Sequence, residues 1–303
     1  MEIQKISILG AGAMGAAYAA MFSDAGNFSV SFVARGERYR RLKQRALTIN
    51  KKQYTIPVIH PDQVAEPAHL ILVALKHHHL PDALPDIKSL VGDDTVVLSV
   101  MNGLESEEMI GAVYGMDKMV YAISVGIDAV REGNRFTFSN SGKILFGKGS
   151  NTSIGDRVDR LQEALNRAGI SNEVPKDMMR VMWWKFMINV GINQASAVLG
   201  ASYRTFQSSP EARALMTSLM QEVIALAQKI NIDLNQKDLE EWRNILSALS
   251  PMGKTSMLQD IEAGRKTEVE IFAGKMVSMG KKYQVPTPVN ETVLRIIKVI
   301  EGR

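Results

Sequence analysis

The sequence predicts an α/β domain with a doubly wound, mostly parallel sheet, followed by a second domain that is all α. Up to residue 174, short runs rich in valine and isoleucine alternate with helical stretches. After Pro175 the strand signals end and long helical patterns follow. Alternating strands and helices are typical of right-handed crossovers in a parallel sheet. We therefore expect one domain at residues 1–174 and another at 175–303.

The strands and helices of the first domain follow from this pattern. Buried strands are expected at Lys5–Leu9, Ser29–Ala34, Leu70–Leu75, Thr95–Val100 and Met119–Val125. An alanine-rich helix over Gly12–Ala25 connects the first two strands and ends at Gly26-Asn27. Arg135–Ser139 and Lys143–Phe146 predict a hairpin, and Ser153–Ala168 predicts an amphipathic helix.

The second domain is expected to consist of long helices. Their patterns cover Asp177–Leu199, Pro210–Ile230, Lys237–Leu249, Thr255–Tyr283 and Val289–Ile300. Asp177 and the pair Ser208-Ser209 stand just before two of these helices, where such residue types favour a helix start.

The composition limits the classes of function. The chain has 303 residues, of which 46% are hydrophobic and 22% charged, as in ordinary globular proteins. It has no cysteine, which excludes thiolate nucleophiles and disulfides, so that redox chemistry would need a bound cofactor. The net charge of +4 is spread along the chain, and we expect neither a nucleic acid nor a membrane as partner. Without a targeting segment or an apolar run of about 18 residues, the chain is expected to be cytoplasmic.

A GxGxxG run follows the first predicted strand and opens the first predicted helix. It consists of Gly10, Ala11, Gly12, Ala13, Met14 and Gly15. The first glycine permits a tight turn, the second lets the backbone approach a pyrophosphate, and the third lets helix and strand pack closely. The alternative is a purely structural turn. The position of the GxGxxG run in the first strand–helix unit favours dinucleotide binding by a Rossmann-type domain.

The end of the second predicted strand favours NADP(H) over NAD(H). At this position an acidic residue would bind the ribose hydroxyls of NAD(H), whereas an arginine would bind the 2′-phosphate of NADP(H). The residue here is Arg35. Glu37 keeps NAD(H) as an alternative. Arg38, Arg40 and Arg41 can equally form the solvated face of a helix.

Two further predicted strands end in polar residues, Lys76 and Asn102. In a doubly wound sheet these carboxyl ends line the ligand crevice, so both are placed to meet the nicotinamide end of the cofactor.

Polar residues also interrupt an apolar helix of the second domain. At 100° per residue Lys185, Asn189 and Asn193 share one face among bulky apolar neighbours. A buried lysine is costly, and burial lowers its pKa toward the range that suits a proton donor. The alternative is a lysine that reaches solvent beside two satisfied asparagines. On the later helix, Ser256, Asp260 and Glu268 are weaker candidates because many such side chains are merely solvated.

With these residues in view, the chain resembles the ketopantoate reductase (2-dehydropantoate 2-reductase) family over nearly its whole length. The likeness is carried by GAGAMG, Leu75-Lys76, Met101-Asn102-Gly103, Lys185-x3-Asn189-x3-Asn193, Ser256–Asp260 and Thr267–Glu270. The resemblance implies NADPH-dependent reduction of 2-dehydropantoate to (R)-pantoate, in pantothenate and coenzyme A biosynthesis.

The resemblance also implies roles for single residues. Lys185 matches the general acid, and Glu268 matches the residue that binds the substrate hydroxyl. The remaining matches are to substrate contacts at Asn189, Asn193 and Ser256, to nicotinamide and substrate neighbours at Lys76 and Asn102, and to a 2′-phosphate contact at Arg35. Asp260 is expected to be structural.

The chain departs from the family pattern at two places. Met101 stands where glutamine is frequent, and His77-His78-His79 follows Lys76. Three adjacent histidines cannot face one metal from a strand, so we expect loop residues and no metal site.

Other functions stay open. One is a related NADP-dependent enzyme that acts on another 2-oxo acid, a 3-hydroxy acid, an opine or a glycerol phosphate, although the stretch Lys185–Asn193 has no arginine for a phosphate. Another is a non-catalytic NADP sensor. The methionine-rich second domain could form a homodimer interface, but methionine at helical spacing is more often core.

Overall fold

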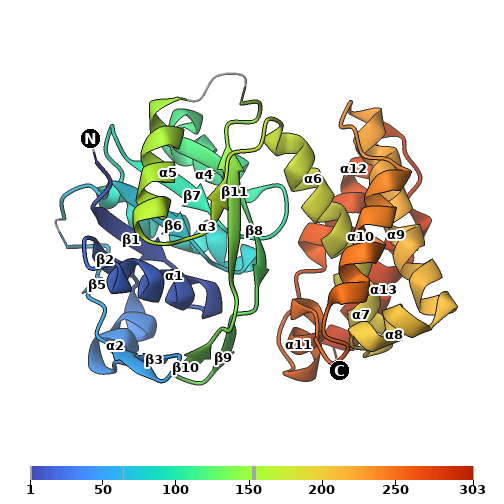
Figure 1. The fold of residues 1–303 in the computed structure, drawn as a ribbon, viewed down its shortest axis with the longest axis horizontal. Coiled ribbons are helices and arrows are strands. Elements are labelled where there is room, and N and C mark those ends of the chain that lie inside the picture. Colours follow the sequence, from blue (N-terminus) through green and yellow to red (C-terminus); the bar gives the residue numbers. More distant parts are fainter. Residues whose placement is uncertain (1, 64, 152–154, 303) are drawn as a thin grey trace. The chain divides into compact units, whose positions relative to one another are not determined.

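The computed structural model describes residues 2–63, 65–151 and 155–302. The chain divides into two compact units, Met1–Met178 and Met179–Arg303, here called the first and second unit (Figure 1). The first combines a sheet with helices, and the second is helical, which confirms the predicted fold class.

The first unit contains an eight-stranded sheet in the order β12-β11-β8-β7-β6-β1-β2-β5. Its strands are β1 (Lys5–Leu9), β2 (Ser29–Val33), β5 (Val58–Ile59), β6 (Leu70–Val73), β7 (Val96–Ser99), β8 (Met119–Ile127), β11 (Ser141–Gly147) and β12 (Asn172–Glu173). Neighbours from β8 through β5 pair in parallel, whereas β11 pairs antiparallel with β8. All five predicted strands are therefore confirmed.

Helices cover both faces of this sheet. They are α1 (Ala13–Asp24), α2 (Gly36–Gln44), α3 (Leu80–Ala83), α4 (Ser106–Tyr114) and α5 (Asp156–Arg167) (Figure 1). Residues 153–154 of the predicted Ser153–Ala168 helix lie outside the described part of the chain. Successive strand residues point to opposite faces. Leu70 and Leu72 accordingly join the core that contains α1 and α5, while Ile71 and Val73 join the one that contains α3 and α4.

The predicted hairpin of Arg135–Ser139 with Lys143–Phe146 is wrong. β10 (Arg135–Thr137) instead pairs with β9 (Val130–Glu132) in a second sheet of order β4-β3-β10-β9, which includes β3 (Leu47–Ile49) and β4 (Lys52–Tyr54). The hairpin turn is formed by Gly133-Asn134, where Gly133 has a φ of +63°. A two-residue turn of this kind favours pairing of β10 with β9. This turn lies just before Arg135, where the predicted hairpin began.

In the second unit one continuous helical stretch carries most of the candidate catalytic residues. It runs through α6 (Met178–Ile188), a π-helical turn at Asn189–Asn193 and α7 (Gln194–Leu199). A short α8 (Tyr203–Ser208) precedes α9 (Pro210–Lys229) and α10 (Gln236–Ala248). The predicted start of α9 is confirmed, since the Ser209 side chain accepts a hydrogen bond from the Ala212 amide.

The predicted single helix over Thr255–Tyr283 is wrong. It is divided into α11 (Ser256–Glu262), a second π-helical turn (Glu270–Gly274) and α12 (Lys275–Tyr283), and α13 (Pro288–Glu301) follows. α11 ends where Gly264 adopts a left-handed φ of +60°. The Arg265 amide then donates to Asp260 O and the Gly264 amide to Ile261 O, the hydrogen bonds of a Schellman motif. Among the described residues no helix is both long and apolar enough to cross a membrane.

Candidate active site

The sheet order of the first unit brings four candidate segments to one edge. β7, β6, β1 and β2 are consecutive and parallel, so their carboxyl ends lie side by side. Asn102, Lys76, the turn Gly10–Gly15 and Arg35 each follow one of these ends, in that order along the edge. Such an edge, where the chain order reverses on either side of β1, is where open α/β sheets bind ligands.

Each glycine of the turn has a different structural role. Gly10 has a φ of +116°, and a Cβ there would lie 2.3 Å from Ala74 O. A Cβ on Gly15 would lie 1.8 Å from Gly10 O, so the third glycine lets α1 pack on the turn. A Cβ on Gly12 would have only Ala74 O near it, at 4.0 Å. Packing within the protein therefore requires Gly10 and Gly15, while Gly12 borders open space.

The amino end of α1 faces this turn. Gly12 is the N-cap residue of α1 and has no side chain with which to cap it. The first amides of a helix lack partners within the helix and carry partial positive charge. The turn thus offers backbone donors beside the space at Gly12, an arrangement suited to a phosphate.

A small pocket of about 110 Å³ adjoins the glycine turn. It is lined by Leu9, Gly10, Val33, Ala34, Arg35, Arg38, Leu75, Ala83 and Asp86. Arg35 lies just before α2 and its Nε is 2.5 Å from Asp86 Oδ1. Burial raises the pKa of Asp86, and the charge of Arg35 opposes that rise. Sequence reasoning missed Asp86, because it belongs to no motif and is distant from Arg35 in the chain.

Lys76 and Asn102 are both half-buried at the strand edge. Lys76 directly precedes η1 (His77–His79), a short 3₁₀ helix where we expected loop residues. The first of its histidines, His77, lies with Nε2 3.7 Å from Glu105 Oε2.

In the second unit the structure brings two candidate asparagines together. Asn193 Nδ2 donates to Asn189 Oδ1 at 3.3 Å, and Lys185 lies one turn earlier on α6. Asn193 is buried, whereas Lys185 and Asn189 are half-buried. The two asparagines begin and end a π-helical turn, so the uniform α-helical spacing that we assumed does not hold here. π-helical turns of this kind are frequent at functional sites.

A buried glutamine, Gln194, links this π-helical turn to the second one. Its Nε2 donates to Val190 O at 2.8 Å and to Asn290 Oδ1 at 3.0 Å. Its Oε1 accepts from the amide of Ala273, within the turn Glu270–Gly274, at 2.9 Å. The two π-helical turns also pack against each other. Sequence reasoning did not identify Gln194, although a polar residue in an apolar helix was a usable signal.

The remaining candidates lie on elements around these turns. Ser256 is the exposed first residue of α11, which packs against the segment Asn189–Leu199. Glu268 is only 5% exposed and lies two residues before the second π-helical turn. Asp260 Oδ1 is 3.0 Å from Arg265 Nε, as befits the structural role that we expected.

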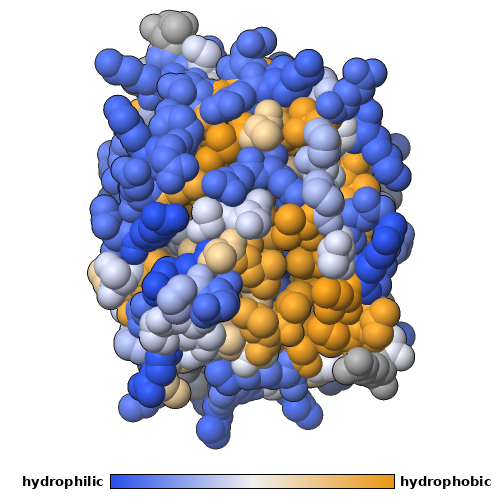
Figure 2. All heavy atoms as spheres, turned by 90° about the vertical axis from the view of Figure 1, so that its right-hand side faces the viewer, coloured by the Kyte–Doolittle hydropathy of each residue, from blue (hydrophilic) through white to orange (hydrophobic). Residues whose placement is uncertain are grey.

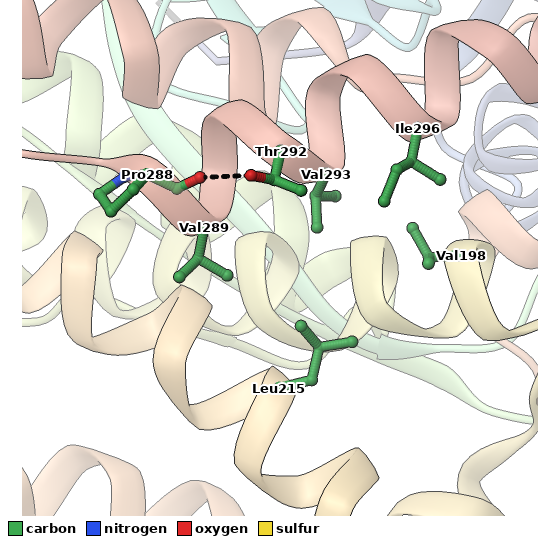
Figure 3. Close-up of a pocket in the computed structure, with 7 residues that line it drawn as sticks. All are labelled: Val198, Leu215, Pro288, Val289, Thr292, Val293 and Ile296. Atoms are coloured by element: carbon green, nitrogen blue, oxygen red, sulfur yellow. Dashed lines mark hydrogen bonds between the residues drawn. The ribbon is translucent and has the colours of Figure 1, made fainter.

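An apolar surface lies elsewhere on the second unit. Figure 2 shows hydrophobic side chains gathered on part of the face turned to the viewer, and Leu199, Ile296 and Val299 are exposed. A pocket of about 350 Å³ lies between α7, α9 and α13. Its apolar side chains point into a common space (Figure 3); they are Val198, Leu215, Pro288, Val289, Val293 and Ile296. None of these side chains suits proton transfer or binding of a carboxylate.

Comparison with known proteins identifies the family. Residues 6–151 match the family model described as ketopantoate reductase PanE/ApbA, and residues 177–301 match its C-terminal counterpart. A curated 2-dehydropantoate 2-reductase from Aquifex aeolicus is 25% identical over 99% of this chain and 97% of its own.

Solved structures show the same fold. D-mandelate dehydrogenase, solved with NADH and anilino(oxo)acetate, superposes with a TM-score of 0.89 at 24% identity, over 99% of this chain and 98% of that one. A dimeric ketopantoate reductase from Staphylococcus aureus has a TM-score of 0.84 at 18% identity, over 98% of this chain and 99% of that one. The two family models together span both units, and the chain belongs to the ketopantoate reductase family of oxidoreductases.

Proposed function

We propose that this protein reduces 2-dehydropantoate to (R)-pantoate with NADPH. The observation that carries the proposal is the polar group of the second unit, in which a lysine and two asparagines lie at a π-helical turn among bulky apolar side chains. Family membership makes this reaction class the expected one.

The first unit has features that fit a phosphorylated dinucleotide. The open space at Gly12 and the amino end of α1 would hold the pyrophosphate, for which Gly10 and Gly15 shape the turn. Arg35 and Arg38, which line the adjoining pocket, would hold a 2′-phosphate. Lys76 and Asn102 would contact the nicotinamide end. When bound, the cofactor supplies the hydride that reduces the ketone carbon.

The second unit would supply the proton and hold the substrate. Lys185 would donate its proton to the ketone oxygen as negative charge develops there. Glu268 would accept a hydrogen bond from the substrate's distal hydroxyl. Asn189, Asn193 and Ser256 would orient the 2-oxo acid, and a fixed orientation lowers the entropic cost of the reaction.

The direct test is the loss of NADPH absorbance with a panel of 2-oxo acids. 2-Dehydropantoate should give the highest kcat/KM, and NADPH should give a lower KM than NADH. If none of the 2-oxo acids were reduced, the proposed reaction class would be wrong. A lower KM for NADH than for NADPH would contradict the cofactor assignment alone.

A second candidate is a reductase of another 2-oxo acid. The D-mandelate dehydrogenase of the same fold is the reason to consider it, because its solved complex contains the oxo acid anilino(oxo)acetate. Benzoylformate, the 2-oxo acid of mandelate, therefore belongs in the panel. A higher kcat/KM with benzoylformate than with 2-dehydropantoate would favour this candidate.

The homodimer is a further proposal about the assembly. The S. aureus relative is dimeric, and the apolar surface around the exposed Ile296 (Figure 3) would be buried against a second copy. Sedimentation of the wild type and of Ile296→Asp tests it. We expect the wild type to sediment as a dimer and Ile296→Asp to sediment as a monomer.

A further inference from the structure

The pocket beside the glycine turn contains a carboxylate that the proposed reaction does not use. Asp86 has a side chain only 7% exposed, whereas its partner Arg35 is 55% exposed. The carboxylate therefore lies behind the guanidinium, and an anion that enters from solvent meets Arg35 first. The ion pair is formed at Nε, the inner nitrogen of Arg35, which lies 2.5 Å from Asp86 Oδ1.

The backbone around Asp86 is held firmly in place. Asp86 belongs to η2 (Leu84–Leu90), a 3₁₀ segment. Leu84, Ile87 and Leu90 of this segment are buried in the core beneath the sheet, together with Leu9 and Val33 from the strands that carry the pocket. A residue on such a well-packed segment can fix the position of a flexible side chain.

The pair is costly, which argues for a role beyond stability. Burial raises the pKa of Asp86, and Arg35 is the main group that lowers it. An ion pair with one buried partner recovers little net stability after desolvation of that partner, and in some proteins such pairs serve to specify one arrangement of side chains.

We propose that Asp86 is a positioning residue that fixes Arg35 for recognition of the 2′-phosphate of a phosphorylated adenosine. Asp86 holds Nε, and the two Nη groups of Arg35 face the phosphate, which they can bind in a forked geometry. Arg38, which lines the same pocket, adds a second positive charge. This inference rests on the proposed use of NADPH.

The physical reason is the freedom of an arginine side chain. An arginine without this partner samples many rotamers, and binding must then immobilise it. The cost for one such side chain corresponds to roughly a 3- to 10-fold change in affinity. The negative charge of Asp86 acts in the opposite direction by repelling the phosphate, but the interposed guanidinium screens it.

The test is calorimetric binding of two nucleotides to the full-length protein without substrate. 2′-AMP carries the phosphate that Arg35 would bind, and 5′-AMP lacks it. Asp86→Asn should weaken 2′-AMP by about 3- to 10-fold and leave 5′-AMP unchanged. Asp82→Asn is the matched control, since Asp82 is an exposed aspartate one turn earlier, and it should change neither affinity.

Two results would overturn the inference. Unchanged or tighter 2′-AMP binding in Asp86→Asn would mean that the carboxylate does not position Arg35. Equal weakening of both nucleotides would mean that Asp86 merely supports the pocket.

Arg35→Ala separates this inference from the proposed function. If that variant binds 2′-AMP normally, the assignment of Arg35 and the NADPH proposal fail together. If it binds 2′-AMP weakly while Asp86→Asn does not, only the role of Asp86 fails. As a second readout, Arg35→Ala should lower Tm because it leaves the buried carboxylate unpaired, and the added Asp86→Asn should restore part of the loss.

Discussion

The two units position their candidate residues by different means. In the first unit these residues follow the ends of parallel strands, and the sheet order places them along one edge. In the second unit they lie in and around two π-helical turns, and a buried glutamine hydrogen bonds to both turns. Backbone topology thus places the candidate cofactor residues, whereas side-chain hydrogen bonds shape the surroundings of the candidate catalytic residues.

This difference predicts how each unit should respond to substitution. A change in a turn of the first unit should act through backbone conformation and the space left for a ligand. A change in the second unit should act through a single proton donor or a single hydrogen-bonded support.

The largest effect is expected for Lys185→Ala in the second unit. Loss of a general acid lowers kcat by about 10²- to 10⁴-fold. The affinity for NADPH should stay nearly unchanged, because the features that fit the cofactor lie in the first unit. Steady-state kinetics measures the first quantity and NADPH titration the second.

Lys281→Ala is the control for Lys185→Ala, because Lys281 is an exposed lysine on α12. It should retain wild-type turnover. If Lys185→Ala turned over substrate as fast as Lys281→Ala, Lys185 would not be the proton donor. The expectation that the second unit acts through a single proton donor would then be wrong.

In the first unit, alanine at Gly10 and alanine at Gly12 should have opposite consequences. Gly10→Ala requires an L-residue at a φ of +116° and places a Cβ 2.3 Å from Ala74 O, so it should cost about 2–4 kcal/mol of unfolding free energy. Gly12→Ala meets only Ala74 O at 4.0 Å and should fold normally. It should nevertheless weaken NADPH binding by about tenfold or more, because its methyl group occupies the space open to the pyrophosphate.

Thermal unfolding and NADPH titration of both variants measure these effects. If Gly12→Ala bound NADPH like the wild type, the turn would be merely structural. That outcome would restore the alternative that the sequence left open for the GxGxxG run.

The contrast between the units also explains what the sequence could predict. Runs of valine and isoleucine identify buried strands, because both faces of a parallel sheet are covered. Parallel strands then bring Lys76 and Asn102 to one edge without further information. Local signals therefore sufficed for most of the first unit.

The missed features depend on contacts between distant segments. Asp86 reaches Arg35 only because η2 is packed in the core, and no local pattern encodes that contact. The π-helical turn at Asn189–Asn193 departs from a uniform helical period, and the side chain of Gln194 bonds within it. The break at Gly264 did have a local signal, because glycine is common just after the end of a helix, but the surrounding helical pattern outweighed it.

Gln194→Leu tests whether side-chain hydrogen bonds shape the second unit. The variant loses the bonds to Val190 O, Asn290 Oδ1 and the Ala273 amide, and it leaves buried polar groups unpaired. We expect a loss of about 2–3 kcal/mol of unfolding free energy. The KM for the 2-oxo acid should also rise, because the π-helical turn that carries Asn189 and Asn193 loses its support.

Gln207→Leu provides the comparison, since Gln207 donates to Leu246 O and Leu249 O, on neither π-helical turn. It should lower stability without changing KM. Equal KM values in the two variants would show that Gln194 contributes to stability alone.

The smallest effect concerns the pH dependence of stability in the first unit. His69 Nδ1 accepts hydrogen bonds from the amides of Gln4 and Lys5, where β1 begins. Burial lowers the pKa of His69, and the positive charges of Arg160 and Lys5 lower it further. The folded state therefore favours the neutral ring, whose Nδ1 can accept these hydrogen bonds.

The sign of the pH effect follows from this preference. The unfolded chain binds a proton near its ordinary pKa of about 6.5, before the folded chain does. The contribution of His69 is thus fully present above that pH and is lost as the pH falls through the lower folded pKa. Urea unfolding at pH 7.5 and 5 should show a decrease toward acid that is smaller in His69→Gln and unchanged in His79→Gln, which replaces an exposed histidine. If both variants kept the wild-type decrease in stability, protonation of His69 would not be the source of that decrease. The hydrogen bonds of His69 Nδ1 would then contribute nothing measurable to the start of β1.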